Sequence, residues 1–210
     1  MALQAEIIAV TPFRQNCTLL WDDETREAVL TDVGGDVPYL LQELDAKNLT
    51  LTAIWLTHGH LDHAGGVVEL REHRPVPVIG PHADDDFLLQ ALPETTAQYG
   101  FPVSPAFEPT RWLTEGETLK VGSHAFQVLH IPGHTPGHVV FYCAEAGLLI
   151  AGDVLFYETI GRTDFPRGNH ADLIYNIRTK LFVLPEDTRV IAGHGRMTDI
   201  GHEKRHNPFF

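Results

Sequence analysis

The first half of the chain alternates short apolar runs with polar turns and predicts strands separated by helices. After the early strands, Asp36 is placed as the N-cap of a helix that runs to about residue 48. Residues 51–57 form a nearly continuous apolar run, typical of a strand buried on both faces. A second helix is predicted over about 62–73. The early β-prone runs lie at residues 6–10, 16–21 and 27–32.

The second half repeats this pattern after an irregular stretch. Residues 92–116 contain four prolines and little periodicity, which predicts a long surface loop. The apolar positions in 170–184 match one helical face. Residues 202–210 are predicted to be a polar tail ending in an aromatic pair. Further strands are predicted at 124–131, 139–144, 148–151 and 188–192. Strands grouped with helices between them indicate a layered α/β sandwich, which we expect to be a single domain over residues 1–210.

Composition narrows the class of protein. The 210 residues are 43% hydrophobic and 20% charged, an ordinary globular balance. The formal net charge of −13 opposes binding to phosphate backbones, so no nucleic-acid partner is expected. No apolar run is long enough to cross a membrane, and the first residues lack the pattern of an export signal. Two cysteines are too few for a disulfide framework, which fits a cytoplasmic protein.

Histidines carry the strongest chemical signal. There are thirteen, none before residue 58, and residues 57–66 read THGHLDHAGG. An H-x-H-x-D-H pattern is expected by chance about 0.003 times in a chain of this composition. It lies where a buried strand leads into a helix. His58 and His60, two apart in an extended turn, can point at one position, while Asp62 and His63 can face a second position nearby.

Three further polar residues follow predicted strands. They are His134 in IPGHTPGH, Asp153 in LLIAGD and His194 in VIAGHG. Five histidines and two aspartates form a nitrogen and oxygen donor set without thiolate, which suits zinc, iron or manganese. The remaining histidines lack this context, and we interpret them as surface or core residues: His73, His82, His124, His130, His170, His202 and His206. His138, four residues after His134, is a candidate to contact a metal ligand, but a structural role is favoured.

These motifs resemble the metallo-β-lactamase-fold hydrolases, and within them the short bacterial glyoxalase II group, the hydroxyacylglutathione hydrolases. The resemblance rests on QNCTLLW, THGHLDHAGG, PGHTPGH, GDVLF, GRTDF and NPFF, which span the chain. It implies a four-layer αββα sandwich with two metal ions at one edge of the paired sheets. It also implies hydrolysis of S-acylglutathione, with S-D-lactoylglutathione as the substrate and methylglyoxal detoxification as the role.

The resemblance assigns each candidate ligand a place. His58, His60 and His134 would hold one metal, Asp62, His63 and His194 the other, and Asp153 would bridge them. Zinc is the favoured metal, with iron or manganese as alternatives. A hydroxide between the metals would attack the thioester carbonyl and a thiolate would leave. Asp62 is the candidate catalytic residue, because it would orient the hydroxide or accept its proton.

The chain departs from the family in its substrate-binding positions. The helical segment that longer members place between the last metal histidine and the NPF motif is missing. Arg162 retains a basic character found in the family, so we expect it to bind substrate. Asp164 and Arg196 stand where the family has aromatic residues. Oligomeric state is not predicted.

Other functions of the same fold remain open. A glutathione persulfide dioxygenase would bind one iron through His58, His134 and Asp153, a 2-His-1-carboxylate set. Phe209 of the NPFF motif favours the hydrolase, because the dioxygenases tend to carry a basic residue at this position. The β-lactamase branch looks more distant, and a nuclease is opposed by the negative charge. A non-enzymatic redox protein would need a flavin-binding partner domain.

Overall fold

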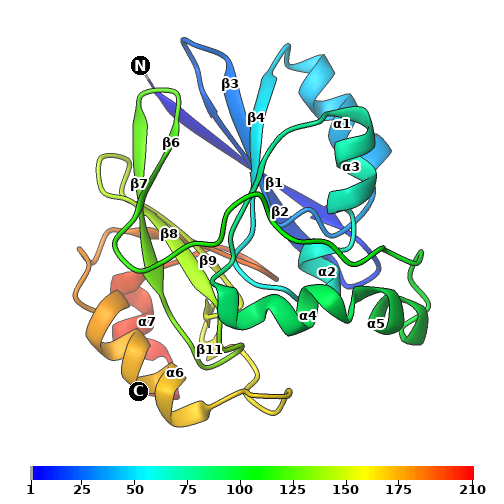
Figure 1. The fold of residues 1–210 in the computed structure, drawn as a ribbon. Helices are drawn as coiled ribbons and strands as arrows, with labels where there is room; N and C mark the ends of the chain where they lie inside the picture. The colour runs from blue at the N-terminus through cyan, green and yellow to red at the C-terminus, as the bar shows by residue number, and fades with distance from the viewer. Residues whose placement is uncertain (1) are drawn as a thin grey trace.

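Two β-sheets packed face to face form the centre of the structure, a computed structural model that describes residues 2–210 (Figure 1). The first sheet has the strand order β1-β2-β3-β4-β5, and the second has the order β13-β12-β9-β8-β7-β6. A separate two-stranded ribbon pairs β10 (Leu155–Phe156) with β11 (Thr159–Ile160). The strands of the first sheet are β1 (Leu3–Val10), β2 (Gln15–Asp22), β3 (Glu27–Thr31), β4 (Thr50–Trp55) and β5 (Val78–Ile79). Those of the second are β6 (Thr118–Val121), β7 (His124–His130), β8 (Val139–Cys143), β9 (Leu148–Gly152), β12 (Arg189–Ala192) and β13 (Thr198–Asp199).

Helices cover the outer face of each sheet. The helices from the first half are α1 (Val37–Ala46), α2 (Leu61–Ala64), α3 (Val67–His73), a 3-10 turn (Ala83–Asp85), α4 (Asp86–Gln90) and α5 (Leu92–Gln98). Those from the second half are α6 (His170–Asn176), which continues into a π-helical turn (Ile177–Leu181), and α7 (Ile200–His206). In Figure 1, α1 and α3 lie on the side of the first sheet, and α6 and α7 lie on the side of the second.

Alternation along the strands sends neighbouring side chains into different cores. In β8, Phe141 packs between the sheets, whereas Val140 and Tyr142 pack under the helices of the second sheet. In β2, Leu20 faces the inter-sheet core and Leu19 faces the core under α1 and α3. Three apolar cores therefore separate four layers, which confirms the predicted αββα sandwich.

The structure corrects the two early helices. The helix predicted over 62–73 is divided into α2 and α3 at Gly65 and Gly66. A Cβ on Gly66 would lie 2.9 Å from the backbone nitrogen of Gly35, so this close approach fixes the break. Asp36 does not cap α1 through its side chain, because its Oδ2 accepts the backbone N–H of Thr11 at 2.7 Å.

Two later segments also differ from the sequence prediction. Residues 92–98 of the predicted loop form α5, which carries Pro93 in its first turn, where no donor is lost. The predicted polar tail is largely helical, because Asp199 Oδ1 caps α7 by accepting the N–H of His202 at 2.7 Å. Of the terminal aromatic pair, Phe209 is exposed and Phe210 packs edge-to-face on Phe182 with ring centroids 4.7 Å apart.

The edge that carries the candidate residues is where parallel strands end. β3 and β4 run parallel in one sheet, and β9 and β12 run parallel in the other. Hydrogen bonds join the two sheets along this edge, because the N–H of Asn16 donates to Gly193 O at 2.7 Å and that of Val139 donates to Thr57 O at 2.8 Å. None of the helices within residues 2–210 has the length and apolar character needed to cross a bilayer.

Candidate metal centre

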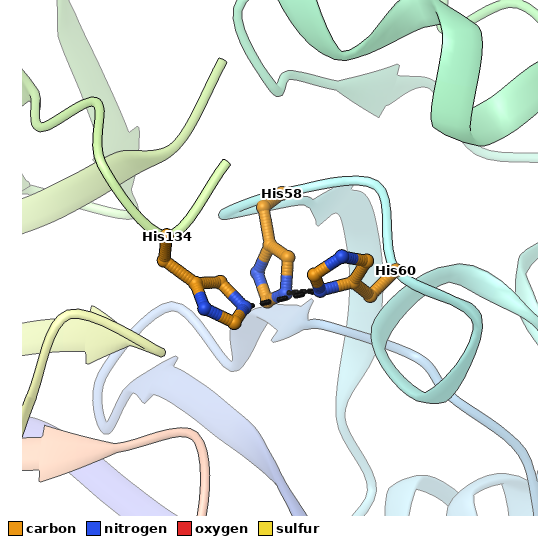
Figure 2. A group of neighbouring side chains, drawn as sticks. All are labelled: His58, His60 and His134. Carbon is orange, nitrogen blue, oxygen red and sulfur yellow. Dashed lines mark hydrogen bonds between the residues drawn. The ribbon is translucent and has the colours of Figure 1, made fainter. Parts of the chain in front are cut away.

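One donor set consists of three imidazoles at the joined edge of the sheets. His58 and His60 lie on the turn after β4, and His134 lies on the turn after β7. The Nδ1 atom of His60 is 3.0 Å from His58 Nε2 and 3.0 Å from His134 Nε2. Figure 2 shows the three rings turned toward one another, His58 and His60 from one turn and His134 from another. The sequence prediction placed these three residues together, and the geometry does so.

A second donor set lies beside the first. Asp62 and His63 occupy the first turn of α2, and His194 follows β12. Asp62 Oδ2 is 3.1 Å from His194 Nε2 and 3.7 Å from His63 Nε2. These donor atoms lie within 4.8 Å of one another, the spacing of a group that could hold a metal ion.

Asp153 lies between the two sets at the end of β9. Its Oδ2 is 3.5 Å from His134 Nε2 in the first set and 3.7 Å from His194 Nε2 in the second. Its Oδ1 is 3.4 Å from His63 Nε2. One carboxylate is thus within reach of both sets, which is the placement that a bridging ligand requires.

Hydrogen bonds made by Nδ1 orient four of the five histidine rings: those of His58, His134 and His194, and that of His63, whose partner is Asp32. Nδ1 of His58 donates to Thr57 Oγ1 at 3.1 Å, Nδ1 of His134 to the Arg162 carbonyl at 2.7 Å, and Nδ1 of His194 to the Phe13 carbonyl at 3.2 Å. In each ring these bonds leave the Nε2 lone pair directed into the centre. Such outer contacts fix tautomer and orientation in known metal sites.

The ionisation of these residues fits a cation. Burial, then the neighbouring imidazoles, hold the pKa of His58 well below its usual range, and burial with His134 lowers the pKa of His60 to about 3. Both rings are therefore neutral donors at pH 7. Although burial opposes it, the nearby His63 keeps the pKa of Asp153 far below that of a free carboxyl. Two buried atoms of the centre, His63 Nε2 and Asp153 Oδ1, have no hydrogen-bond partner within the described residues. Neutral imidazoles in the first set, the ionised carboxylates and these two atoms fit a divalent metal site. In the second set, although burial opposes it, the Asp153 and Asp62 carboxylates raise the pKa of His63 and His194, so an ion bound there would replace a proton.

Asp32 is a functional residue to which the sequence assigned no role. It follows β3, and its carboxylate accepts the backbone N–H of Thr57 at 2.8 Å and the Thr57 hydroxyl at 2.7 Å. Its Oδ2 also accepts Nδ1 of His63 at 3.0 Å, which directs His63 Nε2 into the centre. Nothing in the local sequence links Asp32 to these partners, which lie 25 and 31 residues further along the chain.

Asp85 ties together the two turns that carry the first donor set. Its buried carboxylate accepts the N–H of Gly59 at 3.0 Å, the Thr135 hydroxyl at 2.8 Å and the N–H of Gly137 at 2.6 Å. Burial raises the pKa of Asp85 to about 6. Nothing in the local sequence distinguishes it from neighbouring acidic residues, because its partners are distant along the chain.

Three histidines outside the predicted ligand set make notable contacts: His138 contacts the metal centre, and His82 contacts His130. His138 Nε2 accepts the backbone N–H of Asp153 at 3.0 Å, and its ring stacks on His58 at 4.7 Å. His82 and His130 lie with Asp84 in a separate cluster. Their rings are stacked at 4.3 Å and 16°. His82 Nδ1 accepts the N–H of Asp84 at 3.2 Å, and His130 Nε2 is 2.9 Å from the Pro136 carbonyl oxygen.

A cavity of about 920 Å³ opens over the two donor sets. Its wall is mainly apolar and aromatic. Arg162, the predicted substrate-binding residue, lies in this wall, but its guanidinium forms two hydrogen bonds with Asp164, at 2.9 and 2.8 Å. The aromatic residues of the wall are Phe13, Phe87, Tyr99, Phe156, Tyr157 and Phe165.

Comparison with known proteins agrees with this geometry. A model of the metallo-beta-lactamase superfamily matches residues 10–194, from the end of β1 to the last candidate ligand. The chain belongs to the metallo-beta-lactamase superfamily. Within it, hydroxyacylglutathione hydrolase GloC of Haemophilus influenzae is 49% identical to this chain over 99% of its length and 98% of that protein.

Solved structures of the superfamily superpose closely. The B3 metallo-beta-lactamase BLEG-1 has a TM-score of 0.90 and 39% identity, covering 98% of this chain and 99% of that one. TTHA1623 in a di-iron-bound form has a TM-score of 0.89 and 36% identity, covering 98% and 100%. ETHE1 from Myxococcus xanthus has a TM-score of 0.78 and 30% identity, covering 99% and 84%. The sequence motifs indicated a distant β-lactamase branch, but a B3 metallo-beta-lactamase is 39% identical to this chain.

Proposed function

We propose that this protein is a metal-dependent thioester hydrolase of the glyoxalase II type that cleaves S-acylglutathione. The observation that carries the proposal is the pair of donor sets sharing Asp153 at the base of the cavity. The 49% identity to a hydroxyacylglutathione hydrolase over nearly the whole of both chains supports the substrate class. S-D-lactoylglutathione is the proposed substrate, which places the enzyme in methylglyoxal detoxification.

In this proposal the seven donors hold two divalent ions, zinc by preference. His58, His60 and His134 hold one, Asp62, His63 and His194 hold the other, and Asp153 bridges them. Such ions lower the pKa of bound water and polarise a carbonyl. The structure of TTHA1623 in a di-iron-bound form supports a two-metal centre that contains iron. Iron and manganese are therefore the alternatives to zinc.

The chain's own residues then position the reactants. Asp62 Oδ2 faces the cavity 3.1 Å from His194 Nε2, and from there it orients the attacking water or accepts its proton. The carbonyl of Arg162 and the Asp32 carboxylate hold the rings of His134 and His63 in place. The aromatic wall excludes bulk water from the thioester carbon, and the thiolate leaves through the open side of the cavity.

The proposed enzyme works in the cytoplasm as a single domain. Cys17 and Cys143 are both free and buried, as in proteins of reducing compartments. Both sheets contribute donors, so one sandwich suffices for the chemistry.

Two other activities of this fold are tested against the proposal. A mono-iron glutathione persulfide dioxygenase would use His58, His134 and Asp153 as a 2-His-1-carboxylate set, and His134 Nε2 is 3.5 Å from Asp153 Oδ2. That activity gives no role to the second donor set, Asp62, His63 and His194. The likeness to a protein titled B3 metallo-beta-lactamase favours a test of β-lactam hydrolysis.

The test is elemental analysis of the purified protein with activity measured on the same sample. About two metals per chain and cleavage of S-D-lactoylglutathione support the proposal. One iron per chain, no cleavage and oxygen uptake with glutathione persulfide identify the dioxygenase instead. Turnover of a chromogenic cephalosporin without thioester cleavage identifies a β-lactamase.

A further inference from the structure

The cavity wall contains two arginines, Arg162 and Arg196, and only Arg162 forms an ion pair with a described residue. The Arg162 guanidinium is matched by the Asp164 carboxylate in a two-bonded pair, with Nη2 2.8 Å from Oδ2. An approaching carboxylate therefore meets a nearly neutral pair at that position. Arg196, two residues after His194, also lines the cavity and forms no ion pair with any residue in the described part of the chain.

Arg196 is held in place by stacking rather than by an acid. Its guanidinium lies 3.7 Å above the ring of Tyr157. The Tyr157 ring stacks in turn on His202, with centroids 4.9 Å apart and an angle of 18°. His202 Nε2 is 3.0 Å from Glu158 Oε1, so this nearby carboxylate has a partner of its own. The arrangement fixes a free cation in the wall without neutralising it.

We propose that Arg196 binds a carboxylate on the thiol portion of the substrate and makes the enzyme selective for thioesters of anionic thiols. The inference rests on the proposed thioesterase function and adds a specificity residue to it. A guanidinium fixed by stacking presents its N–H groups as a preformed fork for a carboxylate. The chain carries a formal charge of −13, so a fixed cation in the cavity wall adds attraction for a substrate carboxylate beyond that of ions bound at the two donor sets.

The experiment compares two thioesters that share the lactoyl group. One is S-D-lactoylglutathione, and the other is its diethyl ester, in which both carboxylates are masked. The measured quantity is the ratio of kcat/KM for the free-acid thioester over the diethyl ester in the metal-loaded enzyme, each variant being compared with wild type. Arg196→Met lowers this ratio about tenfold, chiefly through KM of the anionic thioester. Arg196→Lys, which keeps the charge, restores part of the ratio.

Two matched variants identify the source of any effect. Arg178 also stacks on an aromatic ring, Phe210, at 5.6 Å, but it does not line the cavity, so Arg178→Met leaves the ratio unchanged. Arg162→Met lowers the ratio less than Arg196→Met does. An Arg196→Met ratio within twofold of wild type overturns the inference, and so does a larger effect at Arg162.

Binding separates this inference from failure of the proposed function. If the wild-type enzyme cleaves neither thioester, the thioesterase function is refuted, and S-methylglutathione is then titrated into the metal-loaded protein by calorimetry. A loss of affinity of about tenfold in Arg196→Met supports the carboxylate contact. Equal affinities, or no binding to wild type, overturn it.

Discussion

Replacing Gly193 with alanine tests whether the bridging position of Asp153 depends on the neighbouring backbone. A Cβ on Gly193 would lie 2.1 Å from Asp153 Oδ1 and 2.8 Å from His63 Cε1. The Gly193 backbone is held on both sides, because its N–H donates to Gly152 O at 2.7 Å and its carbonyl accepts the N–H of Asn16 at 2.7 Å. The Asp153 side chain and the His63 ring are therefore the groups that must move, Asp153 by the larger distance.

The size of that movement follows from the contact distance. Real Cβ atoms essentially never approach another heavy atom closer than 3.0 Å, so the Asp153 oxygen must retreat by at least about 0.9 Å from its present 2.1 Å. Misplacing a reacting group by about 1 Å costs on the order of 100-fold in rate. Gly193→Ala is expected to lower kcat/KM for S-D-lactoylglutathione by about that factor and to reduce the metal content below two per chain.

Gly195→Ala provides the matched control on the other side of His194. A Cβ there meets no heavy atom within 4 Å, but the φ of +76° makes alanine strained by about 1–2 kcal/mol. Thermal unfolding should show this strain, while metal content and kcat/KM stay near wild type. The reasoning is refuted if Gly193→Ala keeps two metals per chain and its kcat/KM is within threefold of the Gly195→Ala value.

Three further substitutions test separate parts of the structure. Asp153→Ala removes the carboxylate shared by both donor sets and should abolish thioester cleavage; full activity would contradict a two-metal mechanism. Asp32→Asn disturbs the bond that orients His63 and should weaken metal binding by about 10–100-fold in a chelator competition, and an unchanged competition curve would remove Asp32 from the site. Hydrogen bonds from Ser123 and Glu24 hold the pKa of Asp22 below 3.8, so it adds stability above pH 3.8 that is lost as the pH falls. Chemical denaturation should therefore show Asp22→Asn to be destabilised at pH 7 and progressively less so toward pH 3, and a destabilisation that does not change with pH would contradict this role of Asp22.

The candidate site was largely predictable from the sequence because its residues stand at strand ends. Apolar β-prone runs before His58, Asp153 and His194 become buried strands, and parallel pairing brings their ends to one edge. The local pattern therefore predicts the strand ends that carry these residues, and the structure brings those ends to one edge.

Other features depend on contacts that local patterns do not encode. The helices α4, α5 and α7 contain five to seven residues, less than two full turns, so their periodicity is too short to register. Asp32 and Asp85 act through partners more than twenty residues away, and only the folded chain identifies them. The compensation of Arg162 by Asp164 is a matter of side-chain geometry, which the sequence leaves open.

Each donor set takes side chains from both halves of the chain. His58 and His60 come from the first half and meet His134 from the second, while Asp62 and His63 meet His194 in the same way. Bound ions in the proposed enzyme would thus act as cross-links that close the seam between the sheets, adding about 2.7 kcal/mol of stability per ion at a hundred times its dissociation constant. At the opposite end of β2, Asp22 accepts hydrogen bonds from the backbone and hydroxyl of Ser123, in the turn between β6 and β7 of the second sheet. These hydrogen bonds join the sheets without a metal ion. Removal of metal would therefore weaken only the end of the sandwich that carries the donor sets, where the N–H groups of Asn16 and Val139 still join the two sheets, and would leave the Asp22 end unchanged.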